Sequence, residues 1–148
     1  MHDSYEAVTE GETIDLGSYN VTRDEILSFA RSYDPQRFHL DDAADSPFDG
    51  VVASGWHTAA MTMRILVDNY LGAANAHGAL GLEKLRWPTP VHPGDTISAS
   101  ITFSGKQPRN DEYGIVHQEI ETGNQDDETV LWMEALVLYP RIGNEAGE

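Results

Sequence analysis

The first half of the chain contains two stretches in which apolar residues recur at helical spacing. The first stretch follows Thr22, which has Glu25 three residues later, the pattern of a capping box at a helix N-terminus. Pro35 cannot continue a helix and also restrains the residue before it. These signals predict a short helix over residues 23–33. Its apolar positions are Ile26, Phe29, Ala30 and Tyr33.

The second stretch is longer and more apolar. Ser54 is a residue type that caps helix N-termini, Gly55 follows it, and Gly72 is a typical helix stop. The pattern predicts a central helix that begins at Gly55 and ends at Gly72. Between the two helices, residues 34–53 show no clear period, so we expect a long ordered loop with one helical turn near Asp41 to Ala44. The apolar stripe of the second helix is Trp56, Ala59, Ala60, Met63, Leu66, Val67 and Tyr70.

The second half of the chain carries strand signals only. In the second strand Ile97, Ala99, Ile101 and Phe103 alternate with Ser and Thr, and the last strand is almost continuously apolar. A continuous apolar strand is typical of a central strand that is covered on both faces. Segments rich in Gly, Pro and polar residues separate the strands. The expected strands are residues 79–87, 96–104, 114–122 and 129–139.

A long apolar helix followed by antiparallel strands needs a sheet that covers the helix. The predicted class is therefore α+β, with a curved antiparallel β-sheet wrapped around a long central α-helix. A length of 148 residues fits one domain over residues 1–148, in which residues 142–148 form a loose C-terminal tail. A sheet of this kind leaves an edge strand exposed. Pairing of two such edges across a twofold axis predicts a homodimer or a higher homo-oligomer.

The charge balance narrows the class of partner. The chain has 25 Asp and Glu against 9 Lys and Arg, a formal net charge of -16, so nucleic acid is not an expected partner. The acids are spread over the whole chain, and lysine occurs only as Lys84 and Lys106. Such a surface stays soluble in concentrated salt, which favours the hypothesis of a halophilic source over an ordinary acidic enzyme.

Other residue types limit the chemistry. The absence of Cys excludes disulfides, thiol chemistry and Cys-ligated zinc. No spacing of His and carboxylates matches a metal site, so we expect neither a metal nor another cofactor. No apolar run approaches a membrane span and the first residues lack the order of a signal peptide, so we expect no membrane partner and a cytoplasmic location. The expected structural residues are His92 and Asp95 in a turn, and His57, His77 and His117 in surface or packing positions.

Asp34 and His39 stand five residues apart, where the first helix must break. A carboxylate and an imidazole on one short, proline-stiffened segment can share a water molecule and act as acid and base. For an isolated pair the plainer interpretation is preferable, with Asp34 as a helix terminator and His39 as a surface loop residue. Two neighbouring motifs favour catalysis here.

Three motifs follow one another along the chain: DPQRFH at residues 34–39, FDGVVASG at 48–55 and PVHPGDT at 90–96. In these motifs and their order the chain resembles the MaoC-like, (R)-specific enoyl-CoA hydratase family. The resemblance covers roughly residues 9–138. It implies a hot-dog fold, a dimer with active sites near its interface, acyl-CoA thioesters as substrates, and Asp34 and His39 as the catalytic pair.

Two positions depart from the family pattern. The Asn between the catalytic residues is Gln36 here, and the Pro moves forward two places to Pro35, which leaves the dyad intact. Better-known hydratases carry a Ser two turns into the central helix, where this chain has Met63. The neighbouring Thr62 faces about 100° away. Substrate preference is therefore expected to differ.

Adding water to a trans-2-enoyl thioester requires a base for the water, an acid for the α-carbon and donors for the enolate oxygen. Asp34 and His39 can fill the first two roles, in an order that the sequence leaves open. Ser54 and Gly55 open a helix whose free N–H groups can hold the thioester oxygen, and Gly55 has no side chain to block it; the alternative is a plain helix start. We therefore predict a hydro-lyase, an (R)-specific enoyl-CoA hydratase or 3-hydroxyacyl-CoA dehydratase.

Two other functions remain open. A hot-dog acyl-CoA thioesterase needs a carboxylate on or beside the central helix, and Asp68, the only acid there, lies near its far end. A non-catalytic acyl-CoA binding subunit is disfavoured by the intact dyad. Arg37, Arg86 and Arg109 could meet CoA phosphates, although a solvated face is the preferred interpretation of each.

Overall fold

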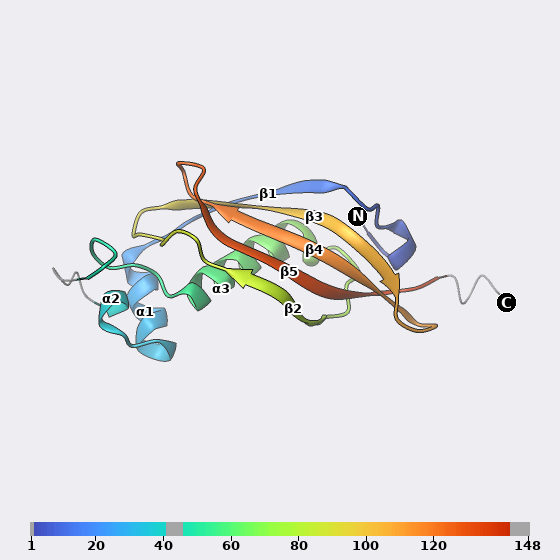
Figure 1. Cartoon of the computed structure of the whole chain (residues 1–148), viewed down its shortest axis with the longest axis horizontal. Helices are drawn as coiled ribbons and strands as arrows, with labels where there is room; N and C mark the ends of the chain where they lie inside the picture. The colour runs from blue at the N-terminus through green and yellow to red at the C-terminus, as the bar shows by residue number, and fades with distance from the viewer. Residues whose placement is uncertain (1, 41–45, 143–148) are drawn as a thin grey trace.

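The protein is built on a curved antiparallel sheet that wraps around one long helix (Figure 1). The computed structural model describes residues 2–40 and 46–142. Within these residues the strand order is β1-β3-β4-β5-β2, so β1 and β2 form the two edges. This arrangement confirms the predicted α+β class. The strands are β1 (Thr13–Asn20), β2 (Ala79–Arg86), β3 (Thr96–Pro108), β4 (Tyr113–Gly123) and β5 (Thr129–Pro140).

The first helices begin and end where local signals place them. The helix α1 spans Arg23–Tyr33, as predicted, and Thr22 Oγ1 accepts a hydrogen bond from the Glu25 N–H at 3.2 Å. After the break at Pro35 the chain forms a four-residue helix, α2, over Arg37–Leu40. The helical turn predicted for residues 41–44 lies outside the described residues.

The central helix α3 spans Gly55–Leu66 and continues as a π-helical segment, Val67–Leu71, up to the predicted end at Gly72. Ser54 occupies the N-cap position of α3, as predicted, but its side chain makes no capping hydrogen bond. One face of α3 packs into the core of the sheet. A buried hydrogen bond of 2.8 Å between the hydroxyls of Thr62 and Thr122 also ties α3 to β4.

The strand β1 was not predicted from the sequence, and it pairs antiparallel with β3. Its apolar signal is weak, since Leu16 is the one buried residue among its eight. Its alternation is also interrupted by a register shift at Gly17, whose φ of 101° is a conformation that favours glycine.

The later strands are present, with two differences from the predictions. The strand β3 continues through Gly105 to Pro108, because these residues still pair with β4. We expected β5 to be covered on both faces, and in the single chain this prediction is wrong. The strand lies inside the sheet, between β4 and β2, but buried and partly exposed residues alternate along it because α3 covers one face.

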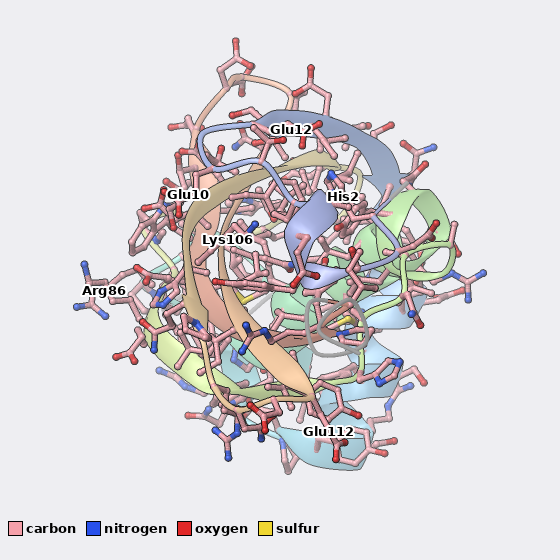
Figure 2. The ribbon with its side chains drawn as sticks, turned by 90° about the vertical axis from the view of Figure 1, so that its right-hand side faces the viewer. His2, Glu10, Glu12, Arg86, Lys106 and Glu112 are labelled. Carbon is pink, nitrogen blue, oxygen red and sulfur yellow. The ribbon has the colours of Figure 1, made fainter. Side chains whose placement is uncertain are left out.

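A largely buried chain of polar side chains ties the N-terminal arm to the π-helical segment that follows α3. His2 Nδ1 lies 2.8 Å from the Tyr70 hydroxyl, which lies 2.5 Å from the Tyr139 hydroxyl, and Gln118 Nε2 donates to Tyr139 at 2.9 Å. His2 Nε2 also lies 3.0 Å from Glu12 Oε1. In Figure 2 these two residues lie well away from Arg86.

No helix in the described part of the chain is long and apolar enough to cross a membrane.

Candidate active site

Asp34 and His39 meet beyond the C-terminus of α1. Asp34 is the C-terminal cap of α1, and its N–H donates to the Ala30 carbonyl at 2.9 Å. His39 lies on α2 and is 7% exposed. His39 Nε2 is 3.3 Å from Asp34 Oδ2, so the two side chains predicted to act together are brought into contact.

A backbone carbonyl orients the imidazole of His39. His39 Nδ1 lies 2.7 Å from the Val52 carbonyl oxygen. Because a carbonyl can only accept, the proton of a neutral His39 sits on Nδ1, and Nε2 presents a lone pair towards Asp34. Val52 precedes α3, so the loop that leads into the central helix also fixes the tautomer of the histidine.

Asp34 is held as a carboxylate. Gln36 Nε2 donates to Asp34 Oδ1 at 2.6 Å, and this hydrogen bond lowers the pKa of Asp34 more than any other contact. Burial works in the opposite direction, while Ser54 and His39 lower the pKa further. The carboxylate and the lone pair of a neutral His39 are then both acceptors, so one water molecule can donate a hydrogen to each.

The dyad lines a cavity of about 390 Å³ at the N-terminus of α3. Ser54 and Gly55 line the same cavity, so the structure brings together all four residues predicted for the site. The walls are mostly apolar, as is usual for a small-molecule site. They include Phe38, Phe48, Val52, Trp56, Trp87, Pro90, Val91 and, from β5, Val130.

The first turn of α3 leaves two donors free. The N–H groups of His57 and Thr58 both donate to the Ser54 carbonyl at 3.0 Å, whereas those of Gly55 and Trp56 have no protein acceptor in the described part of the chain. The buried Ser54 hydroxyl has no hydrogen-bond partner among the described residues, and its proximity to Asp34 lowers the pKa of that carboxyl. The residues that line the cavity therefore include the two acceptors of the dyad and, at the positive end of α3, the two residues whose N–H groups have no acceptor among the described residues.

Trp87 is a site residue that was not predicted from the sequence. Its indole lies against Gly55, where a Cβ atom would come within 2.7 Å of the ring. The ring also packs edge-on against Trp56, with centroids 5.2 Å apart. The close approach that requires glycine at position 55 is thus made by Trp87. The local pattern around Trp87 gave no signal for this contact, because the two residues belong to different elements.

The family of the chain follows from a comparison with protein-family models. The model described as MaoC like domain matches residues 6–124, which include the dyad and all of α3. The chain belongs to the MaoC-like family. Its curved antiparallel sheet around α3 is the hot-dog fold that the resemblance implied.

Known proteins resemble the chain over nearly its full length. The MaoC-like dehydratase from Rhodospirillum rubrum is 37% identical, with a TM-score of 0.87 over 93% of this chain and 97% of that one. The (R)-hydratase from A. caviae is 25% identical, with a TM-score of 0.71 over 88% of this chain and 96% of that one. The uncharacterized protein YdeM from Bacillus subtilis (strain 168) is 29% identical and covers 90% of this chain and 96% of its own.

The helix positions where this MaoC-like chain departs from the family pattern lie outside the cavity. Met63 is 46% exposed and borders a separate apolar hollow of about 280 Å³ between α3 and β2. Thr62 is fully buried against Thr122. Asp68, the acid that a thioesterase would need, forms an exposed ion pair of 2.8 Å with Arg64 and does not line the cavity of the dyad.

The remaining histidines are engaged in packing or turns. His92 Nε2 lies 3.0 Å from the Phe48 carbonyl oxygen, and its N–H donates to Asp95 Oδ2 at 2.9 Å, so both form the predicted turn. His57 is buried and stacks on Phe29. Within residues 2–40 and 46–142, no group of three or more His, Asp or Glu residues could hold a metal ion.

The three arginines considered for CoA phosphates differ in position. Arg37 lies on α2, between the two members of the dyad in the sequence. Arg86 directly precedes Trp87 and projects outward from the molecule (Figure 2). Arg109 lies in the β3–β4 turn, at the opposite end of the molecule from α1 and α2 (Figure 1). Arg37 and Arg86 are therefore the two that lie close in the chain to residues lining the cavity.

Proposed function

We propose that the protein is an (R)-specific enoyl-CoA hydratase, which also catalyses the reverse dehydration of a 3-hydroxyacyl-CoA. The observation that carries the proposal is a single cavity lined both by the paired side chains of Asp34 and His39 and by the first residues of α3, whose N–H groups have no acceptor among the described residues. Membership of the MaoC-like family and the similarity to an (R)-hydratase support the same reaction class.

The proposed chemistry uses the dyad and the first residues of α3 together. A water molecule donates its hydrogens to Asp34 Oδ2 and His39 Nε2, and its oxygen adds to the β-carbon of the enoyl thioester. Negative charge then moves to the thioester oxygen, which the N–H groups of Gly55 and Trp56 stabilise. The proton taken from water by the dyad returns to the α-carbon on the same face, so addition is syn and the atoms of one water are added.

The remaining features of the proposal concern the substrate and the assembly. The substrate is an acyl-CoA thioester, the chain acts as a homodimer or higher homo-oligomer in the cytoplasm, and the reaction needs no cofactor. The exposed edge strand β2 and the apolar residues beside it support association of two copies.

The assay is loss of enone absorbance when purified protein is mixed with a short trans-2-enoyl-CoA, followed by chiral analysis of the 3-hydroxyacyl product. We expect the (R) product. Asp34→Asn and His39→Ala should each lower kcat by about a hundredfold or more, the usual effect of removing a positioned acid or base.

A second histidine–carboxylate pair provides the matched control. His117 Nδ1 lies 2.9 Å from Glu134 Oε2 on the sheet, outside the cavity. His117→Ala and Glu134→Gln should leave hydration unchanged. Release of free CoA without hydration would establish a thioesterase instead, and a folded Asp34→Asn or His39→Ala protein with normal turnover would remove that residue from the mechanism.

A further inference from the structure

Gln36 replaces the asparagine of the family pattern, and the structure shows where its side chain goes. The Gln36 N–H donates to the Asp34 carbonyl at 2.8 Å, which is the hydrogen bond of a γ-turn centred on Pro35. The turn reverses the chain, and the Gln36 side chain folds back to donate to Asp34 Oδ1 at 2.6 Å. The Gln36 carbonyl in turn accepts from the His39 N–H at 2.9 Å.

We infer that Gln36 is a positioning residue, which holds one oxygen of the Asp34 carboxylate so that the other faces His39. The inference rests on the proposed function for its catalytic meaning, but the contact itself is independent of any substrate. With Oδ1 engaged by the amide, Oδ2 remains free to lie 3.3 Å from His39 Nε2 and to accept from the water between them.

The two departures from the family pattern are explained together. Proline fixes φ near the value that the centre of an inverse γ-turn requires, so Pro35 prepares the reversal. Glutamine has one methylene more than asparagine and so reaches back across this turn to the carboxylate. The proline at position 35 and the longer amide at position 36 therefore act together to place an amide donor on Asp34.

The groups that act on Asp34 come from three segments. Gln36 lies in the turn, His39 on α2, and Ser54 immediately before α3. His39 is the ionisable member of this set. The amide of Gln36 supplies the largest effect, and it stabilises the ionised form because a neutral N–H donor binds a carboxylate more strongly than a carboxylic acid.

The test compares the wild-type protein with Gln36→Leu, which has similar size but no donor, and Gln36→Glu, which adds a negative charge. The first measurement is the NMR titration of the Asp34 side-chain carbon in the protein without substrate. The second is the dependence of kcat and KM on pH for hydration of a trans-2-enoyl-CoA. Gln125→Leu is the control, because Gln125 Nε2 donates to Asp95 Oδ1 at 3.0 Å away from the cavity.

We expect the Asp34 titration to move to higher pH in Gln36→Leu and further in Gln36→Glu, with no change in Gln125→Leu. In Gln36→Leu, kcat should fall by about tenfold or more while KM changes little, because a misplaced group affects the transition state. An unchanged Asp34 titration in a folded Gln36→Leu protein overturns the inference. If the wild type hydrates no enoyl thioester, the proposed function fails while the titration still decides the role of Gln36.

Discussion

At the scale of single residues, Trp87 occupies the space that a side chain at position 55 would need. The indole lies 2.7 Å from the Cβ position, too close for any atom to be added without movement. The residue that opens the oxyanion-binding turn of the proposed mechanism is therefore constrained from outside the helix. Glycine at this position is therefore required by the packing of Trp87.

A double-mutant cycle tests this packing. Gly55→Ala should lower the melting temperature, because the methyl group pushes Trp87 away from α3. Trp87→Leu in the same chain should recover most of that loss. We expect a coupling energy of about 0.5–3 kcal/mol, the range for residues in contact. Thermal melts of the four proteins measure it, and additive effects would show that the two side chains do not compete for space.

The dyad could be predicted from the sequence, whereas Trp87 and the role of Gln36 could not. Asp34 and His39 lie on one short segment, so their spacing alone limits how far apart they can be. Trp87 reaches Gly55 only after β2 has paired with β5, and Gln36 reaches Asp34 only through a γ-turn. The Trp87 contact depends on the pairing of segments that are distant in the sequence. Pro35 favours the γ-turn, but the residue types alone do not specify that the Gln36 amide donates to Asp34.

At the scale of elements, the contact between α1 and α3 contains a buried histidine. His57 lies in the first turn of α3 and stacks on Phe29 of α1, with ring centroids 4.8 Å apart. Its Nδ1 is buried and has no hydrogen-bond partner in the described residues. Burial lowers the pKa of His57 below its usual value of 6.5, and Glu25 opposes this only in part.

This contact should make stability depend on pH. The pKa of His57 is lower in the folded protein, so below about pH 6.5 the unfolded chain binds a proton that the folded one does not, and stability falls. His57→Phe should remove this part of the acid loss, and each kcal/mol recovered raises Tm by about 2–4 °C. Melts between pH 7.5 and 5.5 measure it. The exposed His77→Phe is the control, and parallel curves for wild type and His57→Phe would contradict the prediction.

The helices were more predictable than the strands. A capping box and a proline set the limits of α1, and glycines set those of the central helix, because these residues act on the backbone locally. β1 is polar on most of its length and owes its structure to pairing with β3, which is far away in the sequence. Propensity and periodicity carry little information about such an edge strand.

At the scale of the whole molecule, the edge strand β2 and its surroundings predict a dimer interface. Leu80 and Leu82 on β2, and Met63 and Val67 on the central helix, are large apolar residues that are exposed in the single chain. We expect the wild-type protein to be a dimer with twice the chain mass of 16.3 kDa. Leu82→Lys should make it monomeric, because the substitution places a charge in this apolar patch. Light scattering measures the mass. Ile142→Lys, at an exposed apolar residue beyond β5, should remain dimeric, and a dimeric Leu82→Lys protein would place the interface elsewhere.

The net charge of -16 predicts a response to salt. Repulsion among the carboxylates, and between them and the anionic CoA of the proposed substrate, extends about 30 Å at 0.01 M ionic strength and about 3 Å at 1 M. Both Tm and kcat/KM should therefore rise between 0.01 M and about 1 M KCl. Flat or falling values of both quantities would remove the halophile hypothesis without affecting the proposed reaction.

The strand order also has a kinetic consequence. The strands β3, β4 and β5 follow one another in the chain and lie side by side, whereas β1 and β2 join the sheet through partners distant in sequence. The entropic cost of closing a loop rises with its length. We therefore expect the β3-β4-β5 meander to form first and the edge strands β1 and β2 to join it late. Trp87, directly after β2, and α3 then meet only near the end of folding. A refolding protein should therefore regain sheet structure before it regains the proposed hydratase activity.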